Sequence, residues 1–259
     1  MEIEKLLHSL IPTEFQVPAN PVHRTLTKIG YFRLRTWLAS RGERVPNANL
    51  YQPLYSPWEG EPAFEMLYRQ TQNLTLVSRD RCYLLWKTLQ QSLNLTGDFV
   101  ECGVFRGGTA LLEARTLQGQ MSKRKLHLFD SFAGMPETTD GVDSFEAGDF
   151  SRTSAEAVAR LLKPYSFVEM HVGFIPDTFQ GLELEHIAWV HIDVDLYQSV
   201  QECISYFYAR LVPGGFMIFD DYGFPSCPGA RRAVDEAFAK LPEVPICLPT
   251  GQCLVVKLR

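Results

Sequence analysis

Hydrophobic and polar positions alternate along the chain with two different periods. From residue 75 onward, short apolar runs such as "KLHLFD" and "GGFMIFDD" are followed by longer amphipathic stretches such as "TSAEAVARLL". Short apolar runs are typical of buried strands, and apolar positions that recur at helical spacing are typical of amphipathic helices. Strands and helices that take turns predict βαβ units, and therefore an α/β domain with a mostly parallel sheet and helices on both faces.

The end of the chain departs from this rhythm. The tail "PICLPTGQCLVVKLR" places two apolar runs on either side of a short turn, with no room for a crossover helix. This pattern predicts a hairpin, so the last strand should be antiparallel. The sequence predicts seven strands, over residues 98–102, 125–130, 166–172, 187–194, 215–220, 245–248 and 253–258.

The first 74 residues differ in composition from the rest of the chain. "IPTEFQVPANPVH" and "NANLYQPLYSPWEGEP" are rich in proline, asparagine and aromatic residues, with a basic segment between them. Such stretches favour irregular structure and short helices over an independent core. We therefore expect an N-terminal extension over 1–74 and one α/β domain over 75–259, whose first helix, "SRDRCYLLWKTLQQSL", begins after Ser78 as its N-cap.

Composition narrows the class of protein. Of the 259 residues, 46% are hydrophobic and 21% charged, which is typical of a globular protein. The formal net charge of -5 gives no basic footprint for nucleic acid. No apolar run approaches the roughly 20 residues that span a membrane, and the charged N-terminus does not resemble a signal peptide. The six cysteines form no CxxC pair, so we expect reduced thiols in a cytoplasmic protein.

The first predicted strand leads into a glycine-rich turn, "FVECGVFRGGTALLEA". Glu101 ends the strand, Gly103 and Gly107 let the backbone approach a ligand closely, and the helix that begins near Thr109 offers free N–H groups. A dinucleotide site would read GxGxxG, whereas this loop reads ExGxxxGG. An acid at the head of the loop suits a cationic ligand such as S-adenosylmethionine, although many loops of this kind bind nothing.

Two further segments suit the same ligand. Asp130 ends the second predicted strand, 29 residues after Glu101, where a carboxylate accepts hydrogen bonds from ribose hydroxyls. In "FEAGDFSRTS", Asp149 and Phe150 offer an acceptor and a stacking face for adenine. Each has a structural alternative, because a strand-end aspartate often caps a helix and Gly-Asp before Ser and Thr is an ordinary loop.

Four aspartates follow the fourth and fifth predicted strands. Asp193 and Asp195 stand in "WVHIDVDLYQS", and Asp220 and Asp221 end "GGFMIFDD". Residues two apart in a strand share a face, and the carboxyl ends of parallel strands form the ligand side of an open α/β sheet. Four carboxylates there would raise one another's pKa unless a cation compensates their charge. Oxygen ligands favour Mg²⁺, or Ca²⁺ or Mn²⁺, whereas helix capping explains only one or two of the four.

His191 lies in phase with Asp193 and is a further candidate for the same site. A histidine this deep in an apolar strand is more often a core residue with satisfied hydrogen bonds. Both interpretations remain open from the residues alone.

Five segments in order resemble the macrocin O-methyltransferase family over about residues 70–240. They are "LTLVSRDRCYLLWKTLQQSL", "GDFVECGVFRGGTALLEARTL", "LFDSFAGMPE", "HIDVDLYQSV" and "LVPGGFMIFDDYGFPSCPGARRAVDEAF". Members of this family methylate sugar hydroxyls of macrolide and aminocoumarin antibiotics with S-adenosylmethionine and Mg²⁺. The resemblance implies a class I methyltransferase fold, a Rossmann-like seven-stranded sheet, and a small-molecule hydroxyl acceptor, a sugar of a natural product.

The resemblance also implies roles for individual residues. Asp195 matches the aspartate proposed as general base in some members. The metal ligands it implies are Asp193, Asp220 and Asp221. The cofactor-binding residues are Glu101, Gly103, Arg106, Gly107, Thr109 and Asp130, to which we add the adjacent Ser131 and the adenine candidates Asp149 and Phe150. Two departures, Phe105 in place of a common tryptophan and "HIDVDLYQS" in place of "LDGDLYES", touch no proposed ligand.

In such enzymes the N-terminal region tends to cover the active site and contribute to dimers. We therefore expect residues 1–74 to act as a lid, to select the acceptor and to support a homodimer. Two other functions remain alternatives. One is a metal-dependent phosphoester hydrolase, which would use clustered aspartates but needs no acid-headed glycine loop. The other is a non-catalytic cofactor-binding protein on the same fold, which would be expected to lose the acidic cluster.

Overall fold

A computed structural model describes residues 56–120 and 124–259 of the chain. Its centre is a seven-stranded sheet with the strand order β3-β2-β1-β4-β5-β7-β6. The strands are β1 (Asp98–Cys102), β2 (Leu126–Asp130), β3 (Val168–Val172), β4 (Ile187–Ile192), β5 (Leu211–Phe219), β6 (Ile246–Cys247) and β7 (Cys253–Val256). The α-helices are α3 (Pro62–Thr71), α4 (Arg79–Ser92), α5 (Gly108–Leu117), α6 (Ala155–Leu162), α7 (Tyr197–Phe207) and α8 (Pro228–Phe238). Three short 3₁₀ turns complete the list: η1 (Pro57–Gly60), η2 (Asp177–Phe179) and η3 (Tyr208–Arg210).

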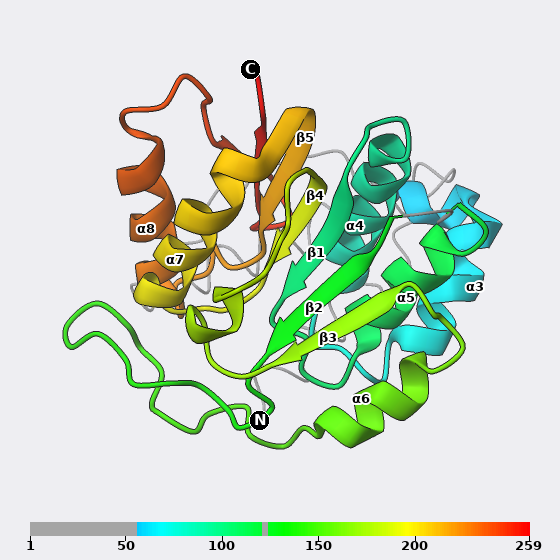
Figure 1. The fold of residues 1–259 in the computed structure, drawn as a ribbon, viewed down its shortest axis with the longest axis horizontal. Helices are drawn as coiled ribbons and strands as arrows, with labels where there is room; N and C mark the ends of the chain where they lie inside the picture. The colour runs from blue at the N-terminus through cyan, green and yellow to red at the C-terminus, as the bar shows by residue number, and fades with distance from the viewer. Residues whose placement is uncertain (1–55, 121–123) are drawn as a thin grey trace, which may run out of the picture. The chain divides into compact units, whose positions relative to one another are not determined.

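Helices cover both faces of the sheet, as predicted. Helices α3, α4 and α5 lie on one side, and α7 and α8 lie on the other (Figure 1). Two apolar clusters fill the two interfaces, one around Trp189 and Leu112 and the other around Phe207 and Phe219. The alternating strand-and-helix pattern of the sequence therefore builds a three-layer α/β unit.

The antiparallel last strand is confirmed, because β7 pairs antiparallel with β5 while β1 to β5 run parallel. Strand β5 begins earlier than predicted, at Leu211 instead of residue 215. Proline followed by two glycines, as in "VPGG", is typical of a turn, which is why the predicted strand begins after it. In the structure this segment pairs with the tail, because the Gly214 N–H donates to the Lys257 carbonyl at 2.8 Å and the Lys257 N–H donates to that of Gly215 at 2.9 Å.

Helix α3 falls inside the expected N-terminal extension. Its Phe64 is fully buried in the cluster around Trp189, and it packs against Tyr83 and Trp86 of α4. The division at residue 74 and the roles expected for residues 1–74 stay predictions, since residues 1–55 lie outside the described part of the chain.

The strand order reverses between β1 and β4, since β2 and β3 extend the sheet to one side of this pair and β5 to the other. In open α/β sheets, ligands bind at such a switch point, beyond the carboxyl ends of the strands.

All six cysteines are free thiols, and five of them are buried. Among the helices of residues 56–120 and 124–259, none is long and apolar enough to cross a membrane.

Candidate active site

A cavity of about 300 Å³ opens at this switch point. Its wall comes from the turn after β1, the ends of β2, β4 and β5, the start of α4 and the loop between β2 and α6. Predicted site residues that line it are Gly103, Thr109, Asp130, Ser131, Phe150, Asp193, Asp195 and Asp221. The sequence motifs for cofactor and metal therefore meet at one cavity.

Gly103 sets how closely the ends of β1 and β4 approach. Its φ of +90° lies in the left-handed region, and a Cβ there would lie 1.8 Å from the carbonyl oxygen of Asp193. The Asp193 N–H donates to the Cys102 carbonyl at 2.8 Å, which extends the strand pairing by one bond. Only glycine fits this position without moving the backbone of Asp193, so Gly103 positions an acidic residue as well as the loop.

Asp130 organises the glycine-rich turn. One carboxylate oxygen accepts from the N–H groups of Val104 and Phe105 at 2.7 and 2.8 Å, and the other accepts from the Phe132 N–H at 2.7 Å. Ser131 donates to the Gly134 carbonyl at 2.8 Å and so closes the following turn. These bonds fix a carboxylate at the cavity wall.

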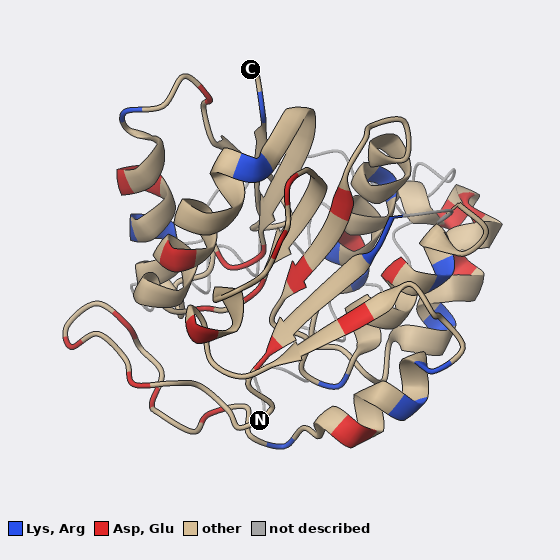
Figure 2. Ribbon diagram, viewed as in Figure 1, with Lys and Arg blue, Asp and Glu red and all other residues tan. Residues whose placement is uncertain are grey.

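The loop between β2 and α6 supplies an aromatic wall. Phe150 lines the cavity and meets Phe105 and Phe145 edge-on, with ring centroids 6.2 and 5.5 Å apart. Asp149 is exposed and accepts from the Glu146 N–H at 3.0 Å, away from the cavity wall. Acidic residues recur along this loop, and residues 131–151 contain no lysine or arginine (Figure 2).

Two predicted residues of the glycine-rich turn, Arg106 and Gly107, do not line the cavity. Arg106 is exposed, donates to the Arg152 carbonyl at 3.0 Å and lies over the Phe105 ring. Gly107 is the N-cap of α5 with a φ of +79°, and a Cβ there would meet Val158 of α6 at 3.2 Å. Both residues therefore shape the turn and its packing, while Thr109 in the first turn of α5 reaches the cavity.

The four aspartates converge at the ends of β4 and β5, but they separate into two groups. Asp193 and Asp220 lie with His191, and Asp195 and Asp221 lie with Cys227, each group having its ligand atoms within 4.8 Å of one another. The expectation that Asp193 and Asp195 share a strand face is wrong. Strand β4 ends at Ile192, and Asp195 has a left-handed φ of +56°.

Asp220 is turned away from the cavity and fully buried. One carboxylate oxygen accepts from Gln252 Nε2 at 2.7 Å and lies 3.4 Å from His191 Nε2, and the other pairs with the Arg81 guanidinium. Burial opposes ionisation, but hydrogen bonding and charge from His191, and the charge of Arg81, hold the pKa of Asp220 below its usual value. Asp220 is thus neutralised by protein groups.

Asp193 and Asp221 are in the opposite situation. Burial and the charge of Asp220 raise the pKa of Asp193 well above its usual range, and burial and the charge of Asp193 do the same for Asp221. Burial also raises the pKa of Asp195, whose carboxylate accepts from Cys227 Sγ at 3.3 Å and whose N–H donates to Asp221 at 3.1 Å. Carboxylates with this excess of negative charge fit a hard divalent cation.

Behind this surface, a buried polar group connects two layers of the fold. His191 is fully buried, with Nδ1 3.3 Å from Glu101 and 3.7 Å from Glu113 of α5. Glu101 points into this group, where it lies 3.3 Å from His191 Nδ1, and it does not line the cavity. Glu101 and Asp220 therefore support the cavity-lining residues from behind.

Sequence reasoning missed three members of the site. Arg81 and Gln252 both contact Asp220, and Glu113 lies beside His191. Arg81 sits in the first turn of α4, where an exposed arginine is ordinary, and Gln252 belongs to the C-terminal hairpin. Glu113 could have been noticed in the sequence, because it is the one charged residue among the buried positions of α5.

Comparison with known proteins places the chain beside a family of methyltransferases. The family described as macrocin O-methyltransferase (TylF) matches residues 69–244. Demethyldecarbamoylnovobiocin O-methyltransferase of Streptomyces niveus is 33% identical over 162 residues, which are 57% of this chain and 60% of that protein. Mycinamicin III 3''-O-methyltransferase of Micromonospora griseorubida is 31% identical over 179 residues, 62% of this chain and 69% of that protein.

Among solved structures, the O-methyltransferase NovP superimposes with a TM-score of 0.64 and 27% identity, over 72% of this chain and 83% of that one. The segment that the family matches, residues 69–244, contains the glycine-rich turn and all four aspartates. The chain spans less than two thirds of the length of the novobiocin relative.

Proposed function

The chain belongs to the macrocin O-methyltransferase family, and from this membership and the cavity we propose that it methylates a hydroxyl of a small molecule, a sugar of a natural product. The methyl donor is S-adenosylmethionine and the reaction depends on Mg²⁺. One observation supports this proposal above others: the glycine-rich turn and Asp130 line the same cavity as Asp193, Asp195 and Asp221. Donor and acceptor sites are thereby adjacent, as direct transfer requires.

The cofactor end of the cavity is the turn after β1. Asp130 uses both carboxylate oxygens to hold the loop. Oδ2 already accepts two N–H bonds, so Oδ1, which accepts one, keeps acceptor capacity for a ribose hydroxyl. The Phe150 ring offers a stacking face for adenine, and the first turn of α5 offers N–H groups at Thr109. Glu101 acts on this end indirectly, through its place beside His191.

The acceptor end is the acidic surface. When bound, S-adenosylmethionine supplies the methyl group, and Mg²⁺ lowers the pKa of a hydroxyl beside it as it does for water. Asp193 and Asp221 would hold the cation, because both line the cavity, whereas Asp220 does not and pairs with Arg81. Asp220 contributes charge from behind, and Arg81 and Gln252 fix its position.

Asp195 is the proposed general base. It lines the cavity, and its left-handed backbone turns its carboxylate away from the Asp193 group toward Cys227. His191 is a weaker candidate, because it is fully buried and both of its ring nitrogens face carboxylates. A base within hydrogen-bond reach of the acceptor hydroxyl removes the proton as the methyl group is transferred.

A product assay tests the proposed function. The full chain is incubated with S-adenosylmethionine, Mg²⁺ and a panel of glycosides with free sugar hydroxyls, and S-adenosylhomocysteine and methylated product are measured by mass spectrometry. We expect methylation of at least one glycoside, its loss with a chelator and its recovery with excess Mg²⁺. Undiminished turnover in the presence of the chelator would contradict the proposed dependence on Mg²⁺. Hydrolysis of a generic phosphoester without S-adenosylmethionine would favour the hydrolase alternative.

A further inference from the structure

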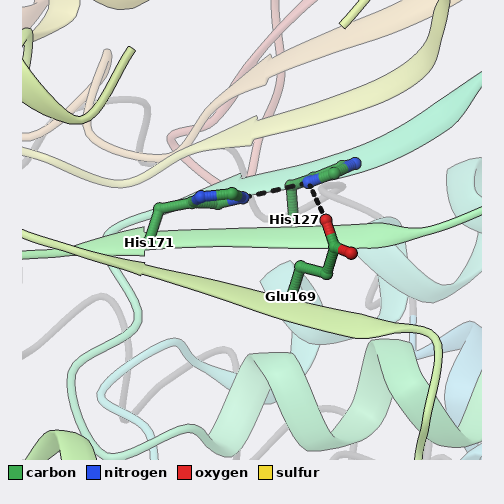
Figure 3. A group of neighbouring side chains, drawn as sticks. All are labelled: His127, Glu169 and His171. Carbon is green, nitrogen blue, oxygen red and sulfur yellow. Dashed lines mark hydrogen bonds and ion pairs between the residues drawn. The ribbon is translucent and has the colours of Figure 1, made fainter. Parts of the chain in front are cut away.

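A second group of metal-ligating side chains lies outside the cavity described above. His127 belongs to β2, and Glu169 and His171 belong to the edge strand β3 (Figure 3). In the parallel register, His127 lies opposite Glu169, and His171 lies opposite Phe129, so all three side chains share one face of the sheet. None of them lines the active-site cavity.

The distances within this group match those of a transition-metal site. His127 Nδ1 lies 3.0 Å from His171 Nε2 and 3.6 Å from a Glu169 carboxylate oxygen, and the three ligand atoms fall within 4.8 Å of one another. Metal–ligand bonds of about 2.0–2.1 Å in a tetrahedron place ligand atoms about 3.3–3.4 Å apart. Small side-chain adjustments would therefore admit an ion between them.

A fourth residue orients the buried histidine. His127 is 3% exposed, and its Nε2 lies 3.4 Å from a carboxylate oxygen of Asp98 in β1. The other oxygen of Asp98 accepts from the backbone N–H of Lys125 at 2.8 Å, which fixes the carboxylate beside the ring. With Nε2–H donating to Asp98, the Nδ1 lone pair is directed at the other two ligands. A carboxylate that accepts the second ring N–H is the usual support of a metal-bound histidine.

The His171 ring is also held in a position suited to binding a metal ion. It stacks on Phe129 at 4.5 Å between centroids, which fixes its plane. Its Nε2 lies 3.0 Å from His127 Nδ1, so the stacked ring directs this nitrogen toward the other ligands. Lys125 is the one nearby cation described, and it pairs with one oxygen of Glu169 while the other oxygen faces His127.

We propose that His127, Glu169 and His171 bind one divalent ion of the zinc class, with water as the fourth ligand and Asp98 as the support of His127. The two-histidine, one-carboxylate set is one that Zn²⁺ uses in proteins, and its two imidazole ligands separate it from the carboxylate-rich surface at the active site. Bound there, the ion fastens the edge strand β3 to β2. This inference does not depend on the proposed methyl transfer.

The test is a Zn²⁺ titration of the full, untagged chain by competition with a chromophoric chelator, with excess Mg²⁺ present to occupy the active-site aspartates. We expect one site in the wild type. His171→Gln should weaken it by more than about 100-fold and Asp98→Asn by about 10–100-fold. The matched control is His186→Gln, because His186 is exposed and outside the group, and it should keep wild-type affinity.

Substitution by Co²⁺ gives an independent readout, since the wild type should show the intense visible bands of a tetrahedral ion and His171→Gln should not. If His171→Gln fails to fold by circular dichroism, Glu169→Gln replaces it, because that side chain is 41% exposed and the substitution keeps its shape. Wild-type Zn²⁺ affinity in a folded His171→Gln or Glu169→Gln variant overturns the proposal. No zinc binding by the wild type overturns it as well.

Discussion

Asp193→Asn is expected to lower methyl-transfer turnover by about a thousandfold or more while changing the affinity for S-adenosylmethionine by less than about tenfold. Asp193 faces the cavity and, unlike Asp220, forms no ion pair with Arg81. Burial and the charge of Asp220 raise its pKa by more than the charges of His191 and Arg81 lower it. Asparagine keeps the shape but removes the charge that attracts a cation. Because a metal contributes several kcal/mol of transition-state stabilisation, its loss reduces kcat far more than cofactor binding. Single-turnover kinetics and calorimetry separate these two effects.

The matched control for this variant is Asp177→Asn. Asp177 is exposed in the 3₁₀ turn η2 and does not line the cavity, so its turnover should equal that of the wild type. Thermal unfolding must show that Asp193→Asn is folded. Replacing an acid whose pKa is raised by burial should not weaken the fold. Near-normal turnover in a folded Asp193→Asn variant at limiting Mg²⁺ would contradict the assignment of Asp193 to the cation.

Asp195→Asn is expected to slow the chemical step by about 10²–10⁴-fold and to leave the Mg²⁺ affinity within a few fold of the wild type. Asparagine tolerates the left-handed backbone that Asp195 adopts, and the N–H that donates to Asp221 is retained. The variant therefore removes the base and little else. Rapid-quench measurement of a single turnover reports the chemical step directly.

The control for the base is His191→Gln, which removes a group that is buried behind the cavity. That variant should retain more of the single-turnover rate than Asp195→Asn at equal loading with cofactor and cation. The opposite order, with a wild-type rate of the chemical step in Asp195→Asn and a large loss in His191→Gln, would identify His191 as the general base.

The fold could be predicted because its signals are local. The βαβ rhythm and the short turn "LPTGQ" before the last strand each depend on neighbouring residues, and the seven strands are found close to the expected positions. The early start of β5 was missed because Pro213 and the two following glycines are typical of a turn. Pairing of Leu211 with Ile187 of β4 and the bonds of the two glycines to Lys257 keep that segment extended.

The candidate site was predicted less completely, because side-chain direction depends on contacts between distant residues. Asp220 and Asp221 are neighbours in sequence, yet Asp220 points to Arg81, 139 residues away, while Asp221 faces the cavity. No pattern within "FDDYG" distinguishes them. In the same way, extended spacing predicts one face for Asp193 and Asp195, and the left-handed turn at Asp195 separates them.

The glycine-rich turn illustrates the same limit. Two residues of its motif, Gly103 and Thr109, line the cavity, but Glu101, Arg106 and Gly107 serve the turn or the layer behind it. Residues that hold a loop and residues that contact its ligand are selected together, so a single sequence does not separate the two roles. The close approach of Gly103 to Asp193 became visible only in three dimensions.

Calorimetric titration of the full wild-type chain with S-adenosylmethionine, with and without a chelator, tests the central claim most directly because it needs no acceptor. The account predicts one saturable site per chain with the same affinity in both conditions, since the residues proposed to hold the cofactor, the turn after β1 and Asp130, differ from those proposed to hold the cation. Absence of saturable binding in both conditions would contradict the assignment of this cavity to a methyltransferase.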